Sequence, residues 1–204
     1  MSNFAWDGNA LLSSAVGALI GSALTLAGVW ISHRLEKAEV ERIEKEEVIG
    51  FLQGIHDELE TLFDSYMSSI GAQTEALQEG TALMFFLPIT QDYFTIYNTN
   101  ARSIGKIKSH DLRKLIVATY AKARGLIDSY RMNNDLLQKF EYAALLFQET
   151  GSAVHQTNAN ARHHSLIQYS AQLKPRHNEL KTMVADLLRN LRKEGVLAPN
   201  GNKS

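Results

Sequence analysis

Residues 10–31 read ALLSSAVGALIGSALTLAGVWI, an apolar run of 22 residues without a charged side chain. At about 1.5 Å of rise per residue, a helix of this length spans about 33 Å, enough to cross the hydrocarbon core of a bilayer. The rest of the 204-residue chain is polar and helical in pattern. We therefore expect a transmembrane helix over residues 10–32 that carries a large helical body.

Two other interpretations of the apolar run remain. A cleavable signal peptide begins with basic residues and ends at a small-residue cleavage site. The first nine residues contain Asp7 but no Lys or Arg, and the run leads into a charged helix. A buried core helix of a soluble protein is disfavoured because the run is apolar on all its faces.

The charges beside the run predict its orientation. Only Asp7 precedes it, whereas the residues after it include His33, Arg34, Lys37, Arg42 and Lys45. Because basic flanking residues stay in the cytoplasm, we expect residues 1–9 to lie outside the cell and the body to be cytoplasmic. The predicted location is the inner membrane, with a single span.

Small residues form a stripe along the same run. In lipid, small side chains let helix backbones approach closely, so such a stripe favours self-association. The alternative is that these residues are simply frequent in transmembrane helices. The stripe, at alternating spacings of four and three, comprises Ser14, Ala18, Gly21, Thr25, Gly28 and Ser32, and Gly17 forms a GxxxG pair with Gly21.

The remaining pattern predicts an all-α fold. A charged helical linker is expected over residues 33–47, a helical body over 48–197 and a disordered tail over 198–204. The first helix should extend from about residue 10 to about residue 79, with a break between Gly80 and Pro88. Further helices are predicted at 90–99, from the N-cap Ser109 to a bend at Asn133–Asn134, at 136–148 with Gly151 as C-cap, at 157–173 and at 176–194.

Apolar side chains recur at helical spacing in three of these segments and predict the core. Strand signals are almost absent. The three faces are Val48, Leu52, Ile55, Leu59, Leu62 and Tyr66; Leu112, Leu115, Ile116, Thr119, Ala123, Leu126, Ile127 and Tyr130; and Leu180, Met183, Val184, Leu187, Leu188 and Leu191.

The net charge of −1 conceals two basic stretches. Residues 101–131 contain eight Lys or Arg against two carboxylates, and residues 150–178 contain no carboxylate. Three explanations remain open: pairing with the acidic first helix, contact with anionic lipid headgroups, and binding of a phosphate-bearing ligand. For the third, the candidate phosphate ligands are Arg102, Lys106, Arg113 and Arg124, the candidate base readers are Asn98 and Asn100, and a second cluster is Arg162 with His163.

No motif predicts an enzyme, a metal site or a cofactor. Adjacent histidines at 163 and 164 point about 100° apart on a helix, so they rarely share an ion. The chain contains no P-loop, no GxGxxG and no nucleophile elbow. We expect no catalysis, no cofactor and no direct DNA binding.

The general layout looks like that of uncharacterised single-span bacterial proteins with cytosolic helical bodies. The residues that carry this likeness are the segment 28–35, Tyr97 to Asn100, Ile104–Gly105, Leu112–Arg113 and Tyr120. More narrowly, the combination resembles the type III CRISPR accessory membrane effector that binds cyclic tetra-adenylate. That resemblance implies a tetrameric cytosolic domain whose ligand rearranges the membrane spans and permeabilises the membrane during phage infection.

These observations together predict a membrane-anchored homo-oligomeric sensor and effector in antiviral defence. Its body would bind an anionic cyclic nucleotide messenger, and the protein would then perturb the membrane. The alternatives are a membrane-tethered scaffold or adaptor, and a superinfection-exclusion protein that needs no small ligand.

Overall fold

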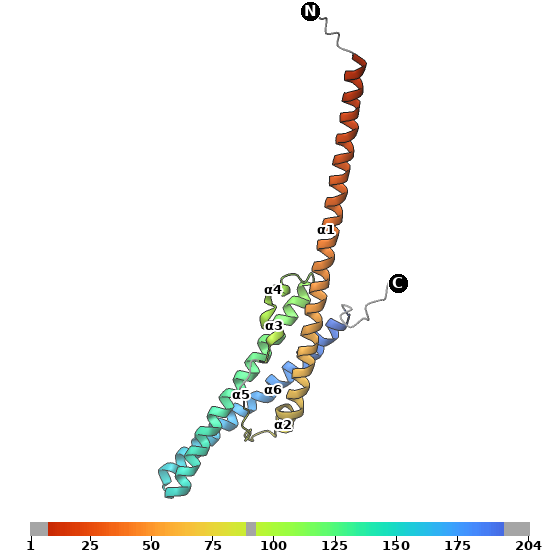
Figure 1. Cartoon of the computed structure of the whole chain (residues 1–204). Helices are drawn as coiled ribbons and strands as arrows, with labels where there is room; N and C mark the ends of the chain where they lie inside the picture. Colours follow the sequence, from red (N-terminus) through yellow and green to blue (C-terminus); the bar gives the residue numbers. More distant parts are fainter. Residues whose placement is uncertain (1–7, 89–92, 194–204) are drawn as a thin grey trace, which may run out of the picture. The chain divides into compact units, whose positions relative to one another are not determined.

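The computed structural model describes residues 8–88 and 93–193, although the side chains of residues 8–24 and of residue 27 lie outside the description. The described part is all-α, as predicted, and contains no strand. Its elements are α1 (Gly8–Tyr66), the π-helix η1 (Met67–Gly71), α2 (Ala72–Ala76), α3 (Thr95–Thr99), α4 (Ala101–Ile104), α5 (His110–Thr150) and α6 (Ala153–Lys193) (Figure 1).

The chain divides into two compact units, residues 1–47 and residues 48–204. Most of the predicted membrane segment, including Ser14, Gly17, Ala18 and Gly21 of the small-residue stripe, lies outside the described side chains, as does the predicted tail. Thr25 and Gly28 of the stripe are exposed. In the part of the chain that is described, no helix combines the length and the apolar character needed to cross a membrane.

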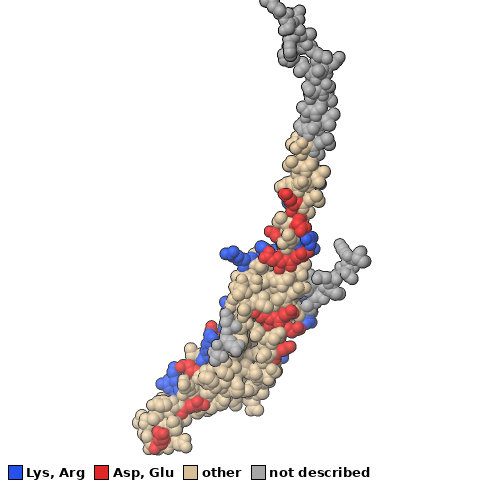
Figure 2. Space-filling view, in the orientation of Figure 1, with Lys and Arg blue, Asp and Glu red and all other residues tan. Residues whose placement is uncertain are grey.

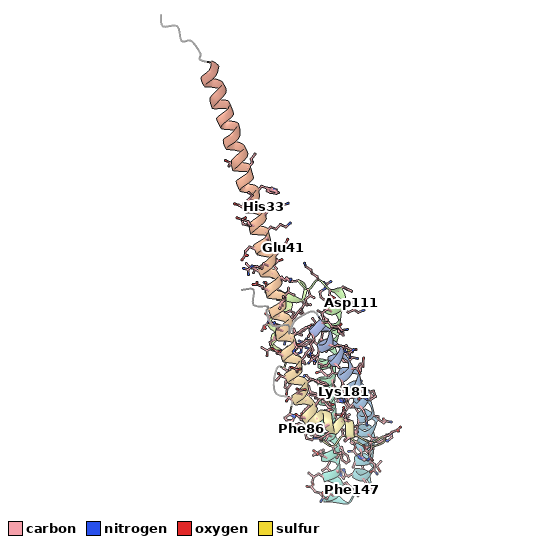
Figure 3. The ribbon with its side chains drawn as sticks, turned by 90° about the vertical axis from the view of Figure 1, so that its right-hand side faces the viewer. His33, Glu41, Phe86, Asp111, Phe147 and Lys181 are labelled. Carbon is pink, nitrogen blue, oxygen red and sulfur yellow. The ribbon has the colours of Figure 1, made fainter. Side chains whose placement is uncertain are left out.

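The body is built on a long hairpin of α5 and α6, which lie side by side in Figure 1. Asp111 lies near the open end of the hairpin and Phe147 near its turn (Figure 3). Ser109 caps α5 as predicted, because its hydroxyl oxygen accepts a hydrogen bond from the Leu112 amide at 3.2 Å. Gly151 ends α5 as predicted, with a φ of 61° that favours glycine.

The α5–α6 seam follows a heptad pattern over most of its length. Buried side chains alternate by four and three positions, which is the spacing of two helices that pack along one another. On α5 these are Leu112, Ile116, Thr119, Ala123, Leu126, Tyr130, Asn133 and Leu137, and on α6 they are Leu166, Ser170, Leu173, His177, Leu180, Val184, Leu187 and Leu191.

Two predicted interruptions of the hairpin are wrong. Asn133–Asn134 does not bend the chain and Pro175 does not end a helix, because α5 and α6 continue through both sites. The Asn133 side chain is buried in the seam instead of turning the backbone. Pro175 is flanked in α6 by the fully buried Leu173 and His177, so packing on both sides outweighs the missing backbone hydrogen bond.

The asparagines hold an extended segment, residues 77–88, which we call the strap. The Asn133 amide donates to the Leu83 carbonyl at 3.1 Å, and the Leu83 amide donates to the Ser170 hydroxyl at 2.9 Å. Asn134 forms two bonds with the Leu87 backbone, at 3.0 and 2.6 Å. The side chains that suggested a bend therefore satisfy the backbone of a segment that has no helix of its own.

The first helix is also shorter than predicted. The α-helix ends at Tyr66, and η1 and α2 carry the helical chain only to Ala76 instead of about residue 79. The hydroxyls of Ser68 and Ser69 donate to the Ser65 carbonyl at 3.0 and 2.8 Å. These bonds compete with backbone amides for the same acceptor, which is consistent with the wider turn of η1.

The three predicted apolar faces meet in one core, as expected from their periodicity. Leu52, Ile55 and Leu59 of α1 are buried with the seam of the hairpin, while Val48, Leu62 and Tyr66 are half-buried against it. Leu115, Ile127 and Leu188 are also half-buried against this core, and Met183 is of intermediate exposure. The short helix predicted at 90–99 is present only as α3, and residues 89–92 lie outside the described part.

Substitutions at two glycines of α1 test how closely α3 packs on this helix. A Cβ at Gly54 would lie 3.0 Å from Cγ2 of Ile96, whereas a Cβ at Gly50 would meet nothing within 4 Å. We expect Gly54→Leu to lower the free energy of unfolding by about 1–3 kcal/mol through overpacking, and Gly50→Leu to raise it by about 0.5–1 kcal/mol. Thermal unfolding of the full chain, followed by circular dichroism, measures both; equal effects would contradict the packing.

Candidate functional site

The predicted base reader Asn98 and the predicted phosphate ligand Arg124 do come together, but they contact each other. The Arg124 guanidinium donates to the Asn98 side-chain oxygen and lies 5.5 Å from the centroid of the Tyr97 ring. Tyr97 stacks on Tyr120 with ring centroids 4.0 Å apart and an interplanar angle of 13°. These contacts fix α3 against α5.

A partly buried acid–phenol contact supports the same junction and was not predicted. The Glu58 carboxylate accepts hydrogen bonds from the Ile96 amide at 2.7 Å, the Tyr97 amide at 3.3 Å and the Tyr120 hydroxyl at 2.8 Å. Burial, with the hydrogen bond to Glu58 as a second cause, raises the pKa of Tyr120 above its usual range. A carboxylate therefore already occupies the amides that open α3, a place where an anionic ligand would otherwise bind.

Other predicted ligand residues also serve the backbone. The Asn100 amide donates to the Ile96 carbonyl at 2.9 Å. Arg113 donates to the carbonyls of Ile107 and Lys108. Arg102 and Lys106 are exposed, and Arg102 forms no ion pair or hydrogen bond with the described part of the chain.

The second predicted cluster is remote from the first. Arg162 is exposed, and the His163 ring packs on Phe140 with centroids 4.9 Å apart. Phe140 follows Arg124 by 16 positions on the continuous helix α5, which corresponds to about 24 Å along its axis. One chain therefore does not bring the two clusters to a common small ligand.

The charged surface of the body is mixed. Figure 2 shows acidic and basic patches next to each other on the face in view. Lys122 pairs with Glu179 at 2.8 Å and Arg192 pairs with Glu60 at 3.0 Å, so part of the basic excess is used within the chain. The described residues contain no group of three or more potential metal ligands.

The described part of the body contains an apolar cavity that the sequence did not predict. It has a volume of about 180 Å³ and lies among α1, η1, the end of the strap, α5 and α6. None of the described residues that line it is charged. The lining consists of Leu59, Leu62, Phe63, Ser65, Tyr66, Ser69, Ile70, Leu87, Tyr93, Phe94, Ala123, Leu126, Ile127, Tyr130, Leu180 and Val184.

A chain of hydrogen bonds runs behind the tyrosines of this cavity. The Tyr66 hydroxyl lies 2.9 Å from the Tyr130 hydroxyl and 2.5 Å from Nδ1 of His177, and the Tyr130 hydroxyl lies 2.7 Å from that of Thr74. Burial is the main cause that raises the pKa of Tyr66 and of Tyr130. Both phenols therefore stay neutral and remain available as donors.

The chain of hydrogen bonds ends at a charged pair, Glu75 of α2 and Lys181 of α6. Nε2 of His177 lies 3.3 Å from the Glu75 carboxylate, to which Lys181 donates at 2.6 Å. The hydrogen bond from Lys181, and then that from His177, lowers the pKa of Glu75. Because a carboxylate only accepts, Nε2 of His177 donates to Glu75, and in the neutral ring Nδ1 then accepts a hydrogen bond from the Tyr66 hydroxyl.

We take this cavity and its hydrogen-bond chain as the candidate functional site. An apolar pocket with a few convergent polar groups is a usual place for a ligand, and π-helical turns are frequent at functional sites. The sequence signal for it was present: Tyr66, Tyr130 and His177 are polar side chains at positions of otherwise apolar heptads. The sequence does not predict that these three side chains contact one another, because their contact depends on the tertiary fold.

Comparisons with known proteins provide no independent indication of function. No family model, no curated protein and no solved structure matches this chain.

Substitution of a buried alanine by leucine tests whether the protein contains this cavity. Ala123 lines the cavity, whereas Ala143 is a buried residue of α5, 2 % exposed, that does not line it. We expect Ala123→Leu to leave the free energy of unfolding unchanged or raise it by about 1 kcal/mol, because the added methyl groups fill existing space. The same change at Ala143 should lower it by about 1–3 kcal/mol. Thermal unfolding of the two variants decides, and comparable losses would contradict the cavity.

Proposed function

We propose that this protein is a membrane-anchored helical receptor without catalytic activity. Residues 10–32 form its membrane span, and residues 48–197 form a cytoplasmic body. The observation that supports this proposal is the extent of α1. The helix Gly8–Tyr66 contains the uncharged apolar run and also supplies Leu52, Ile55 and Leu59 to the core of the body.

Self-association through the small-residue stripe belongs to the same proposal. Gly28 is exposed, and a Cβ built on it would meet nothing within 4 Å, so its backbone is open to a neighbouring helix. A homo-oligomer would bring the spans together along this stripe through close backbone packing. The subunit number that the resemblance implies is four.

Paired arginine substitutions test the anchor. We expect Ile20→Arg with Leu24→Arg to move the full chain into the soluble or aggregated fraction, because each arginine near the centre of a span costs about 2.5–3.5 kcal/mol on insertion. The control is Leu35→Arg with Val40→Arg, two exposed positions outside the run. Carbonate-washed membranes, probed by immunoblot, should retain the wild type and the control. Wild type found in the supernatant would refute the anchor.

A second candidate function is binding of a cyclic oligoadenylate, as in the defence effector that the sequence resembles. The observation that favours it is a set of unpaired cations around α4 and the start of α5. Arg102, Lys108 and Lys114 are exposed and form no ion pair with the described residues. Arg and Lys at such positions would neutralise phosphates of the ligand.

The variants that test this binding leave Arg113 unchanged. Its guanidinium holds the backbone before α5, so a substitution there would disturb the fold. We expect cyclic tetra-adenylate to raise the melting temperature of the full chain by several degrees and its linear form to have little effect. Arg102→Glu with Lys114→Glu should remove this gain, whereas Arg131→Glu with Lys139→Glu should preserve it. A wild type that shows no shift would favour the scaffold or superinfection-exclusion alternative.

A further inference from the structure

We propose that the apolar cavity of the body binds the hydrocarbon tail of an amphiphile. The chemistry of its wall determines the class of ligand. None of the described residues that line the cavity is charged, so the enclosed part of the ligand is neutral and apolar. The hydroxyls of Tyr66 and Tyr130 are already bonded to each other and to His177 and Thr74, so they do not require a polar ligand. This site is therefore distinct from the basic residues around α5.

The size of the cavity limits what can enter it. A dry cavity of about 150 Å³ lined by aliphatic and aromatic side chains binds benzene. The cavity here measures about 180 Å³ and has the same kind of lining, with Leu126, Ile70 and Val184 among its most buried residues. It accommodates a hydrocarbon segment somewhat larger than benzene, which excludes a nucleotide and leaves space for several methylenes.

The mouth of the cavity explains why the ligand is an amphiphile and not a small hydrocarbon. Ser65 and Ser69 line the cavity and are exposed, so they mark its open side. The Ser69 hydroxyl donates to the Ser65 carbonyl at 2.8 Å. An unbranched tail can thus lie inside with its polar head in water beside two serines, and no buried group of the protein loses a partner.

A bound tail would contact three elements, η1, α5 and α6, which lie apart in the sequence and meet only in the fold. The lining includes Ile70 of η1, Ala123 and Leu126 of α5, and Leu180 of α6. A tail in contact with all three elements stabilises the arrangement in which they surround the cavity, by mass action. The π-helix is the element most directly affected, because its wider turn forms part of the wall.

Photolabelling of the full chain in lipid nanodiscs tests the site. The probe is decanol with a diazirine on its terminal carbon, and tandem mass spectrometry maps the insertion sites. We expect label within residues 59–70 and 123–130, with competition by unlabelled decanol. Ala123→Leu removes space for about two methylenes, each worth roughly fourfold in affinity, so labelling should fall about fifteenfold.

The controls separate occupancy from folding. Ala121→Leu places the same substitution on an exposed position of α5 and should leave labelling unchanged. Ser69→Leu narrows the mouth at an exposed position and should reduce labelling. A phosphatidylcholine that carries the same diazirine on its acyl chain distinguishes a membrane lipid from a free amphiphile, and labelling by either probe supports the proposal.

Two results would overturn the proposal. The first is an absence of label from both segments with both probes. The second is equal labelling of wild type and Ala123→Leu. Membrane fractionation is unaffected by either of these results, so the failure of the cavity and the failure of the anchor can be told apart.

Discussion

The heptad seam between α5 and α6 is the constraint on which the body depends. Leu166, Leu173 and Leu187 of α6 are fully buried along it, and α1 supplies the third face of the core. Because neither helix of the hairpin is interrupted, the two helices bring side chains that are far apart in sequence next to one another. Asn133 can thus hold the strap, and Tyr130 can reach both Tyr66 and Thr74.

The core was predictable because it depends on periodicity, which a single sequence displays directly. The two wrong interruptions show where local propensity fails. Asn133–Asn134 and Pro175 are breakers by local preference, but each sits in a helix whose neighbouring turns bury large apolar groups. The buried seam on both sides decides the outcome, and its contribution is visible only when the partner helix is known.

Within one chain the candidate ligand residues do not form one site, for a related reason. Exposed bases and loop asparagines were chosen by residue type, yet the fold assigned several of them to backbone carbonyls and to one another. Arg124 binds Asn98, and Arg113 binds the chain before α5. A sequence does not reveal such contacts, because many different polar pairs can satisfy the same backbone groups equally well. The cavity was missed because an absence of atoms leaves no mark in a sequence.

The hydrogen-bond chain gives a physical reason for the persistence of the cavity. Apolar cores normally collapse onto empty space, and the extent of this relaxation sets the cost of a void. Here Tyr66 and Tyr130 form two sides of the wall, and their hydroxyls are tied to His177 and Thr74. A movement of either ring into the cavity would leave buried polar atoms without partners, which costs more than the van der Waals contact that it would gain. The polar residues of the seam thus keep an apolar space open.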